Sequence, residues 1–358
     1  MLKLSEIRRL HIELTTRCNA RCPMCMRNYR GYEYNSGYPT CELSLADFKH
    51  IVTPELLAQL IRPDAPINGR VPTVFGFRGI TFNGNLGDFA SARDAVDIVE
   101  YIVAHNVPVH INTNGSLRSP DWWSRLALPG VTVGFAIDGM SDTHKLYRQD
   151  TDWHRIIDHA QALIRAGGRA VWRFVPFDHN RHQEQECRQL AHDLGFFEFE
   201  NIYDGRDRGP VFTRDGKFSH VIGLAEPGEV PPIEALLENH VTWYDSKTYR
   251  SHKDVPNLSM NCIHKQNQEI YIAADGSVYP CCFLGFYPHT MSHPGNKELA
   301  PMVQENNALQ YPLEHCLAWF ESVEQAWSKS SIAEGRPYQC VSTCGKSEQA
   351  SADRSVRQ

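Results

Sequence analysis

Short apolar runs alternate with helix-length stretches of mixed polarity along the first part of the chain. Residues 152–167 show the helical pattern best, because Ile156, Ala160 and Leu163 recur on one face of a 3.6-residue period. The apolar runs are typical of buried strands, and we predict strands at 8–15, 79–82, 107–111, 131–137, 170–177 and 196–202. Between them we predict helices, one capped by Ser44 and others over 91–105, 119–127, 152–167 and 183–194.

Six strands that alternate with helices indicate a parallel sheet, because the return from one parallel strand to the next needs a crossover connection. The fold class predicted is α/β, with a partial (β/α)6 barrel of the TIM type. Polar residues follow the carboxyl ends of the strands, which is where such folds place their sites. The functional site is therefore expected at that edge of the sheet.

Glycine and proline interrupt the pattern after the sixth strand. A short helix is predicted near 233–240, and later a β-hairpin that turns at Asp275-Gly276 and a helix over about 314–329. Two loops are predicted earlier, one rich in tyrosine at 26–43 and one rich in proline and glycine at 62–75. The predicted domains are the barrel core (1–203), a linker (204–256), a small C-terminal domain (257–344) and a flexible tail (345–358).

Composition narrows the class of protein. Of the 358 residues, 42% are hydrophobic, which is enough to bury a sizeable core. The net charge is −6 without a basic stripe, so nucleic-acid binding is not expected. No apolar run approaches the length of a membrane span, and the N-terminal Met-Leu-Lys-Leu-Ser-Glu does not resemble a signal peptide. We expect a cytoplasmic protein with no membrane partner.

Eleven cysteines are many for a cytoplasmic chain, where thiols stay reduced and serve metal or redox chemistry. Three of them form the run Cys18-Asn-Ala-Arg-Cys22-Pro-Met-Cys25, directly after the first predicted strand. Three thiolates on one loop can hold three corners of a [4Fe–4S] cluster and leave the fourth iron open, which catalysis needs. Half of a zinc site is the alternative, but zinc sites usually pair Cys-x2-Cys with a second pair.

The spacing of Cys18, Cys22 and Cys25 after a first barrel strand resembles the signature of the radical S-adenosylmethionine superfamily. The segment Phe82-Asn-Gly-Asn-Leu-Gly-Asp88 is similar to the glycine-rich motif that ends strand 2 in that family. Further resemblance lies in Thr113-Asn114-Gly115, Ile137-Asp138-Gly139, His144, Tyr147-Arg148 and Phe177-Asp-His-Asn180. The resemblance extends over residues 8–203.

This resemblance implies a mechanism. The open iron binds the amino and carboxylate groups of S-adenosylmethionine, and an electron from a donor such as flavodoxin or ferredoxin passes through the cluster. The sulfonium C–S bond then breaks to give methionine and a 5′-deoxyadenosyl radical, which abstracts hydrogen from the substrate. The cofactors supply this chemistry, and the protein positions them and excludes water.

The residues expected to contact S-adenosylmethionine lie at the strand ends. Glycine at 84 and 87 allows close approach of the backbone to a ligand, and Arg173 either faces a carboxylate in the barrel or forms a structural ion pair. Met24 replaces the aromatic residue that often packs near adenine in the family, and Ala136 replaces a common serine, which puts a ribose contact there in doubt. The predicted cofactor-binding set is Met24, Asn83, Gly84, Asn85, Asp88, Asn112, Asn114 and Arg173, in which Asn112 and Asn114 meet ribose hydroxyls or serve only a turn.

Cysteines at the other end of the chain predict a second metal site. Cys262-x13-Gly276-x4-Cys281 resembles the opening of the twitch and SPASM auxiliary-cluster domains, with the shorter twitch form closer. The predicted ligands of an auxiliary four-cysteine [4Fe–4S] cluster are Cys262, Cys281, Cys340 and Cys344. A structural zinc site is the alternative, and the sequence leaves open whether Cys282 or Cys316 ligates instead.

Two classes of function remain. The first is an enzyme that modifies a peptide or dehydrogenates a small molecule. The chain starts almost at the first strand, without an added N-terminal domain to grip a leader peptide, so a small molecule or a separate recognition partner is also expected. Tyrosines at 29, 32, 34 and 38 would line a substrate entrance or only pack a loop. The second class is a non-catalytic iron–sulfur or zinc-binding scaffold.

Overall fold

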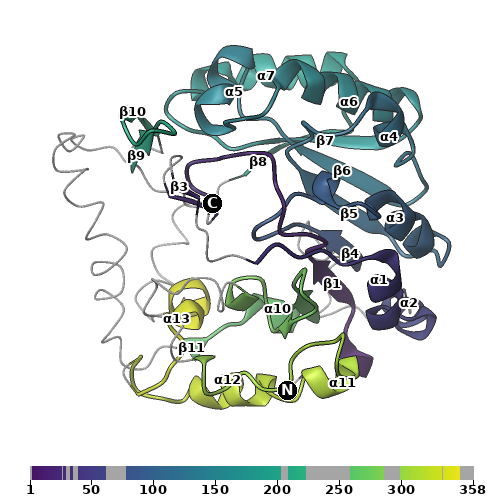
Figure 1. The fold of residues 1–358 in the computed structure, drawn as a ribbon, viewed down its shortest axis with the longest axis vertical. Helices are drawn as coiled ribbons and strands as arrows, with labels where there is room; N and C mark the ends of the chain where they lie inside the picture. Colours follow the sequence, from purple (N-terminus) through teal and green to yellow (C-terminus); the bar gives the residue numbers. More distant parts are fainter. Residues whose placement is uncertain are drawn as a thin grey trace. The chain divides into compact units, whose positions relative to one another are not determined.

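The computed structural model divides the chain into two compact units (Figure 1). Unit 1 comprises Met1–His11, Pro63–Phe77 and Glu238–Gln358, and unit 2 comprises Ile12–Arg62 and Arg78–Leu237. The structure describes residues 2–25, 27–29, 33–34, 39–61, 78–202, 209–222, 259–285, 299–332 and 334–346. Within these ranges, no helix has the length and apolar character needed to cross a membrane.

Unit 2 is built on an open, mostly parallel sheet. Its strands are β1 (Arg9–Ile12, of which Ile12 belongs to this unit), β4 (Gly79–Phe82), β5 (Val109–Thr113), β6 (Val131–Ala136), β7 (Arg169–Phe174) and β8 (Glu198–Asn201). They follow one another in chain order, and each pair from β4 to β8 is parallel. The sheet does not close on itself, which confirms the predicted partial (β/α) barrel.

Helices on the outer side of the sheet bury the predicted apolar faces (Figure 1). Ser44 caps the first of them with a capping box to Asp47, and Asp152 caps the longest. The helices of unit 2 are α1 (Leu45–Ile51), α2 (Pro54–Leu60), α3 (Ala95–Val103), α4 (Pro120–Ser124), α5 (Ser141–Tyr147), α6 (Trp153–Arg165) and α7 (Glu184–Asp193), with short 3-10 turns η4 (Phe89–Ser91) and η5 (Arg181–Gln183).

Several elements differ from the sequence prediction. Strand β5 starts at Val109, after Pro108, because proline cannot donate a ladder hydrogen bond. Within the predicted linker, β9 (Gly209–Phe212) and β10 (Phe218–Ile222) form an antiparallel hairpin. Strands β2 (Asn28–Tyr29) and β3 (Glu33–Tyr34) pair within the predicted tyrosine-rich loop. The predicted loop at 62–75 and the helix at 233–240 lie outside the described residues.

Unit 1 contains the predicted hairpin, formed by β12 (Glu269–Ile272) and β13 (Val278–Tyr279). The turn is longer than predicted, because the strands pair as far as Ala273 and Ser277 and leave three residues between them. Gly276, the last of the three, adopts a left-handed φ of +85°. The single helix predicted over 314–329 is two helices. The other elements are η1 (Leu4–Glu6), β11 (Ser259–Met260), α10 (Ile263–Gln266), α11 (Leu313–Cys316), α12 (Phe320–Ala326), α13 (Tyr338–Cys344) and β14 (Gly345–Lys346).

A buried carboxylate organises the hairpin side of unit 1. Glu269 contacts Arg9 Nε at 2.7 Å and His264 Nδ1 at 2.7 Å, and His11 Nδ1 lies 3.8 Å away. Burial alone would raise the pKa of Glu269, but these three cationic or hydrogen-bonding partners hold it far below its usual range. The group stays ionised and ties the N-terminal residues of the chain to β12.

Candidate active site

The three clustered thiols lie on the loop that leaves β1. Cys22 is buried, whereas Cys18 and Cys25 are half-buried. Burial raises the pKa of the Cys18 thiol, and the charges of Asp88, Cys22 and Cys25 raise it further. The three thiols therefore lie close enough for their charges to act on one another, as their spacing predicted.

Two side chains, one after strand β5 and one at the C-terminal end of helix α5, point N–H groups at these sulfurs. Asn114 Nδ2 lies 3.7 Å from Cys18 Sγ and 3.0 Å from Asn19 Oδ1. Arg148 Nη1 lies 3.9 Å from Cys22 Sγ. Donors of this kind stabilise thiolates, and a cluster bound by thiolates needs them in that state. The residues present therefore fit a three-cysteine [4Fe–4S] cluster.

The glycine-rich loop after β4 is held by a buried glutamate. Glu13 Oε1 accepts hydrogen bonds from the backbone N–H groups of Leu86 at 2.6 Å and Gly87 at 2.7 Å. A Cβ on Gly84 would lie 2.2 Å from the Gly87 carbonyl oxygen, and one on Gly87 would lie 1.7 Å from that of Thr15. These close contacts leave no room for a side chain at either position, which is a second reason for glycine there, beside the predicted approach of a ligand.

We expect a Gly87→Ala variant to lose about 1–3 kcal/mol of unfolding free energy, because the new Cβ overlaps the Thr15 carbonyl. It should also load less iron onto Cys18, Cys22 and Cys25. Gly167→Ala is the matched control, since nothing lies within 4 Å of its Cβ and only its φ of +87° adds strain of about 1 kcal/mol. Equal iron content in the two variants would contradict the role given to Gly87.

Asp88 joins three strand ends. Its N–H donates to the Arg17 carbonyl at 2.8 Å, and its carboxylate accepts from Ala90 N, Thr113 Oγ1 and Asn114 N. Burial raises the pKa of Asp88 despite these hydrogen bonds. The carboxylate is thus engaged inside the protein, and it positions Asn114 beside Cys18.

Polar side chains also meet on the sheet itself. Asn112 Oδ1 accepts from Arg173 Nη1 across Gly134, where a Cβ would lie 2.6 Å from Arg173 Cδ. Arg173 Nε lies 3.4 Å from Glu200 Oε2 on β8. Among the predicted cofactor residues, Asn112 and Arg173 are therefore neighbours, Asn83 is exposed and Asn85 is half-buried.

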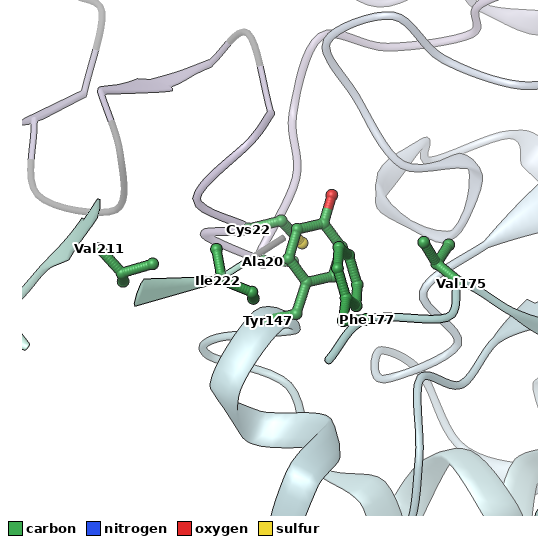
Figure 2. Close-up of a cluster of buried hydrophobic side chains, with 7 residues drawn as sticks. All are labelled: Ala20, Cys22, Tyr147, Val175, Phe177, Val211 and Ile222. Carbon is green, nitrogen blue, oxygen red and sulfur yellow. The ribbon is translucent and has the colours of Figure 1, made fainter. Parts of the chain in front are cut away.

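An apolar cluster adjoins the cysteine loop on one side (Figure 2). The rings of Tyr147 and Phe177 lie 4.6 Å apart beside Cys22. Val211 and Ile222 from the β9–β10 hairpin belong to the same cluster, and Met24, Cys18, Cys25 and Ile202 pack against it. The hairpin, missed by the sequence prediction, thus forms part of the wall around the thiols.

A buried ionic network adjoins the thiols through Arg148. Asp138 is fully buried, and its carboxylate contacts Arg148 Nε at 2.6 Å and accepts from Val175 N at 2.7 Å. His144 Nδ1 accepts the Asp138 N–H at 3.1 Å, and its Nε2 lies 3.0 Å from Thr151 Oγ1. This geometry requires a neutral ring, and burial lowers the pKa of His144 to about 4.

A histidine held neutral destabilises the fold in acid. The folded pKa of His144 lies below its ordinary 6.5, so its contribution is complete above about pH 6.5 and is lost as the pH falls toward 4. That shift corresponds to about 3 kcal/mol. A His144→Gln variant should lose less unfolding free energy between about pH 7 and about pH 4 than wild type does, as measured by denaturant titration. His192→Gln, at a side chain that is 84% exposed, should behave as wild type; identical acid profiles for all three proteins would contradict the prediction.

The C-terminal cysteines come together in unit 1. Cys262 caps α10 and accepts the Lys265 N–H at 3.5 Å, while a hydrogen bond with Cys344 lowers the pKa of Cys262 and raises that of Cys344. Cys281 is buried, which raises its pKa, and the charges of Cys282, Cys340 and Cys262 raise it further, while the charge of Cys281 contributes to the raised pKa of Cys344. All four predicted ligands are therefore neighbours.

Of the two reserve cysteines, Cys282 lies near the predicted ligands, because its charge helps to raise the pKa of Cys281, whereas Cys316 lies apart from them. Cys282 forms a side-chain hydrogen bond with His11. Cys316 is fully buried in α11, with its sulfur 3.8 Å from the Tyr311 carbonyl. Across the described part of the chain, no three His, Cys, Asp or Glu side chains are arranged to hold a single metal ion, whereas a [4Fe–4S] cluster takes each thiolate on a different iron.

Residues 12–188 match the family model described as "Radical SAM superfamily". This match spans just under half of the 358 residues, and over that range the chain is similar to a radical SAM domain. This family uses a [4Fe–4S] cluster and S-adenosylmethionine.

Among solved structures, the chain is similar in fold to Streptococcus suis SuiB. For SuiB bound to precursor peptide SuiA, the TM-score is 0.54 at 11% identity, covering 94% of this chain and 76% of that one. For SuiB bound to S-adenosylmethionine it is 0.51 at 13% identity, covering 93% and 77%. In a further SuiB structure the score is also 0.51 at 13% identity, covering 88% of this chain and 65% of SuiB, less than two thirds of its length. None of the curated proteins matches the chain.

Proposed function

We propose that the protein is a radical SAM enzyme that reductively cleaves S-adenosylmethionine and abstracts hydrogen from a peptide substrate. The observation that carries the proposal is the arrangement of Cys18, Cys22 and Cys25, with N–H donors from Asn114 and Arg148 at two of the sulfurs. When bound, the cluster supplies the electron that splits S-adenosylmethionine into methionine and the hydrogen-abstracting 5′-deoxyadenosyl radical.

The chain's residues bind and orient the cofactors. Cys18, Cys22 and Cys25 would hold the cluster, and the 83–88 loop would present Asn83 and Asn85 to the methionine end of the ligand. The remaining contacts are assigned to the backbone at Gly84, to Met24 near adenine, to Asn112 and Asn114 near ribose, and to Arg173 on the sheet. Asp88 is assigned a positioning role, because its carboxylate already accepts three internal donors.

A second [4Fe–4S] cluster is proposed on Cys262, Cys281, Cys340 and Cys344, as in a twitch domain. The mutual charge coupling of the four thiols supports this ligand set over one that includes Cys316. Closed ligation by four thiolates leaves no open iron, so this cluster would pass electrons or shape the pocket. An external reductant such as flavodoxin or ferredoxin, and a cytoplasmic location, complete the proposal.

A peptide is favoured over a small molecule because the chain resembles in fold a protein that has been solved with its precursor peptide. The test is to add a peptide encoded beside the gene, with deuterium at candidate carbons, to the reduced protein with S-adenosylmethionine. Transfer of deuterium into 5′-deoxyadenosine is expected. Transfer only from small alcohols or sugars would favour the dehydrogenation of a small molecule.

The basic experiment distinguishes the enzyme from a scaffold. Anaerobically reconstituted protein should hold about eight irons per chain, and after reduction it should release 5′-deoxyadenosine from S-adenosylmethionine. Intact clusters without this product would favour the non-catalytic scaffold. About four irons with one zinc would remove the auxiliary cluster from the proposal and leave the catalytic one.

A further inference from the structure

A group of charged side chains lies beside the first thiol of the three-cysteine loop in unit 2. The carboxylate of Glu42 lies between two arginines, with Oε2 3.4 Å from Arg17 Nη1 and Oε1 3.5 Å from Arg93 Nη2. Arg17 directly precedes Cys18 in the chain. The Glu42 side chain is only 11% exposed, whereas those of Arg17 and Arg93 are 53% and 79% exposed, so solvent meets the cations more than the carboxylate.

A second group of the same kind lies beside the next thiol. Asp150 Oδ2 lies 3.2 Å from Arg21 Nε and 2.5 Å from Arg214 Nη2, and the Asp150 carbonyl accepts from Asn19 Nδ2 at 3.2 Å. Arg21 directly precedes Cys22. Arg214 lies in the turn of the β9–β10 hairpin, and 72% of its side chain is exposed. One carboxylate again holds two guanidinium groups next to the loop.

Together the two groups place excess positive charge around the loop. They contain four guanidinium groups and two carboxylates, which gives them a net charge of +2. Arg17 and Arg21 are four positions apart, so their Cα atoms lie within about 14 Å of each other. The whole chain has a net charge of −6, so this local charge is opposite in sign to that of the chain. Exposed charge of one sign steers a partner of the opposite sign to the surface that bears it.

We propose that these four arginines form the docking surface for an acidic one-electron carrier protein that reduces the three-cysteine cluster. The proposal rests on the proposed function, which needs an external electron for each cleavage of S-adenosylmethionine. One electron leaves the carrier, which is oxidised, and enters the cluster, which is reduced. A carrier needs proximity to the thiolates, and Arg17 and Arg21 have it because each directly precedes a cysteine of the loop.

Binding is tested first, without turnover. Oxidised flavodoxin and, separately, oxidised ferredoxin, both acidic, are titrated calorimetrically into reconstituted wild-type protein and into an Arg93→Gln/Arg214→Gln variant, which lacks the two most exposed of the four cations. For the carrier that wild type binds, we expect about tenfold weaker binding by the variant at low salt. The difference should vanish at about 1 M salt, because ions screen exposed charges.

Arg125→Gln/Arg188→Gln is the matched control, because it also removes two exposed cations from unit 2. Arg125 follows α4 and Arg188 lies in α7, with side chains that are 50% and 43% exposed. This control should bind the carrier as wild type does. Equal affinity in wild type and both variants, or binding of neither carrier by wild type, would overturn the inference.

A second measurement separates carrier docking from the proposed function. Release of 5′-deoxyadenosine is measured with limiting reduced carrier and, in parallel, with dithionite, a small reductant that needs no docking surface. The Arg93→Gln/Arg214→Gln variant should lose about tenfold in rate with the carrier and keep the wild-type rate with dithionite. An equal loss with both reductants would overturn the inference and assign the arginines to the cysteine loop or to an acidic peptide substrate. Wild type that releases no product with dithionite would overturn the proposed function, and the inference with it.

Discussion

A Cys22→Ala variant, reconstituted anaerobically, is expected to release no 5′-deoxyadenosine and to hold about four irons per chain instead of about eight. Cys22 is the most buried of the three thiols on its loop, and Arg148 Nη1 lies 3.9 Å from its sulfur. Alanine removes one of three ligands, and two thiolates do not hold the cluster. Iron analysis and product detection by mass spectrometry measure both effects.

Cys187→Ala provides the control for losing a buried thiol. Cys187 is fully buried in α7 of the same unit, and its sulfur is not a proposed ligand of either cluster. This variant should keep about eight irons and the wild-type rate of product release. Product release by Cys22→Ala protein at a rate near that of wild type would refute the assignment of the catalytic cluster.

Arg148→Met is expected to destabilise unit 2 by about 3–5 kcal/mol, because it leaves the Asp138 carboxylate buried without its cation. Burial alone would lower the pKa of Arg148, but the charge of Asp138 and the hydrogen bond to it raise that pKa overall, so the guanidinium stays charged. The variant should also load less iron at Cys22. Denaturant unfolding of wild type and variant at neutral pH measures the loss.

The double variant Asp138→Asn/Arg148→Met tests whether the unpaired carboxylate causes the loss of stability. Asparagine can still accept from Val175 N–H but carries no charge, so the double variant should be more stable than Arg148→Met alone. If the two substitutions were simply additive, the loss would come from packing of the arginine and not from the unpaired carboxylate.

Local patterns in the sequence predicted the strands and the cysteine loop well. Gly79–Phe82 is the strand predicted from four apolar or small residues, and Ser44 caps α1 as its position suggested. The three thiols lie within one loop, so their spacing alone indicated their proximity. These features depend on neighbours in the chain, which a single sequence displays.

The support for the site could not be predicted in this way. Glu13 holds Gly87 across 74 positions of sequence, and Arg148 reaches Cys22 across 126. Such pairs depend on which strand ends meet and at what register. For Glu13, the one signal in the sequence was a glutamate at the end of a strand predicted to be buried. For Arg148, the Tyr147-Arg148 motif indicated the residue but not its partner.

Short elements were also missed where tertiary contacts stabilise them. The β9–β10 hairpin begins with Gly209 and Pro210, which by themselves favour a loop. Its burial comes from Val211 and Ile222, which pack into the cluster beside Cys22. Helix α13 is seven residues long and carries two cysteines, too short for a clear apolar period.

The same hairpin bears on the order in which the protein matures. Cys22 is only 7% exposed, in one buried cluster with Val211 and Ile222 (Figure 2). Undocking of the hairpin would therefore expose the Cys22 thiol to a carrier that delivers an iron–sulfur cluster.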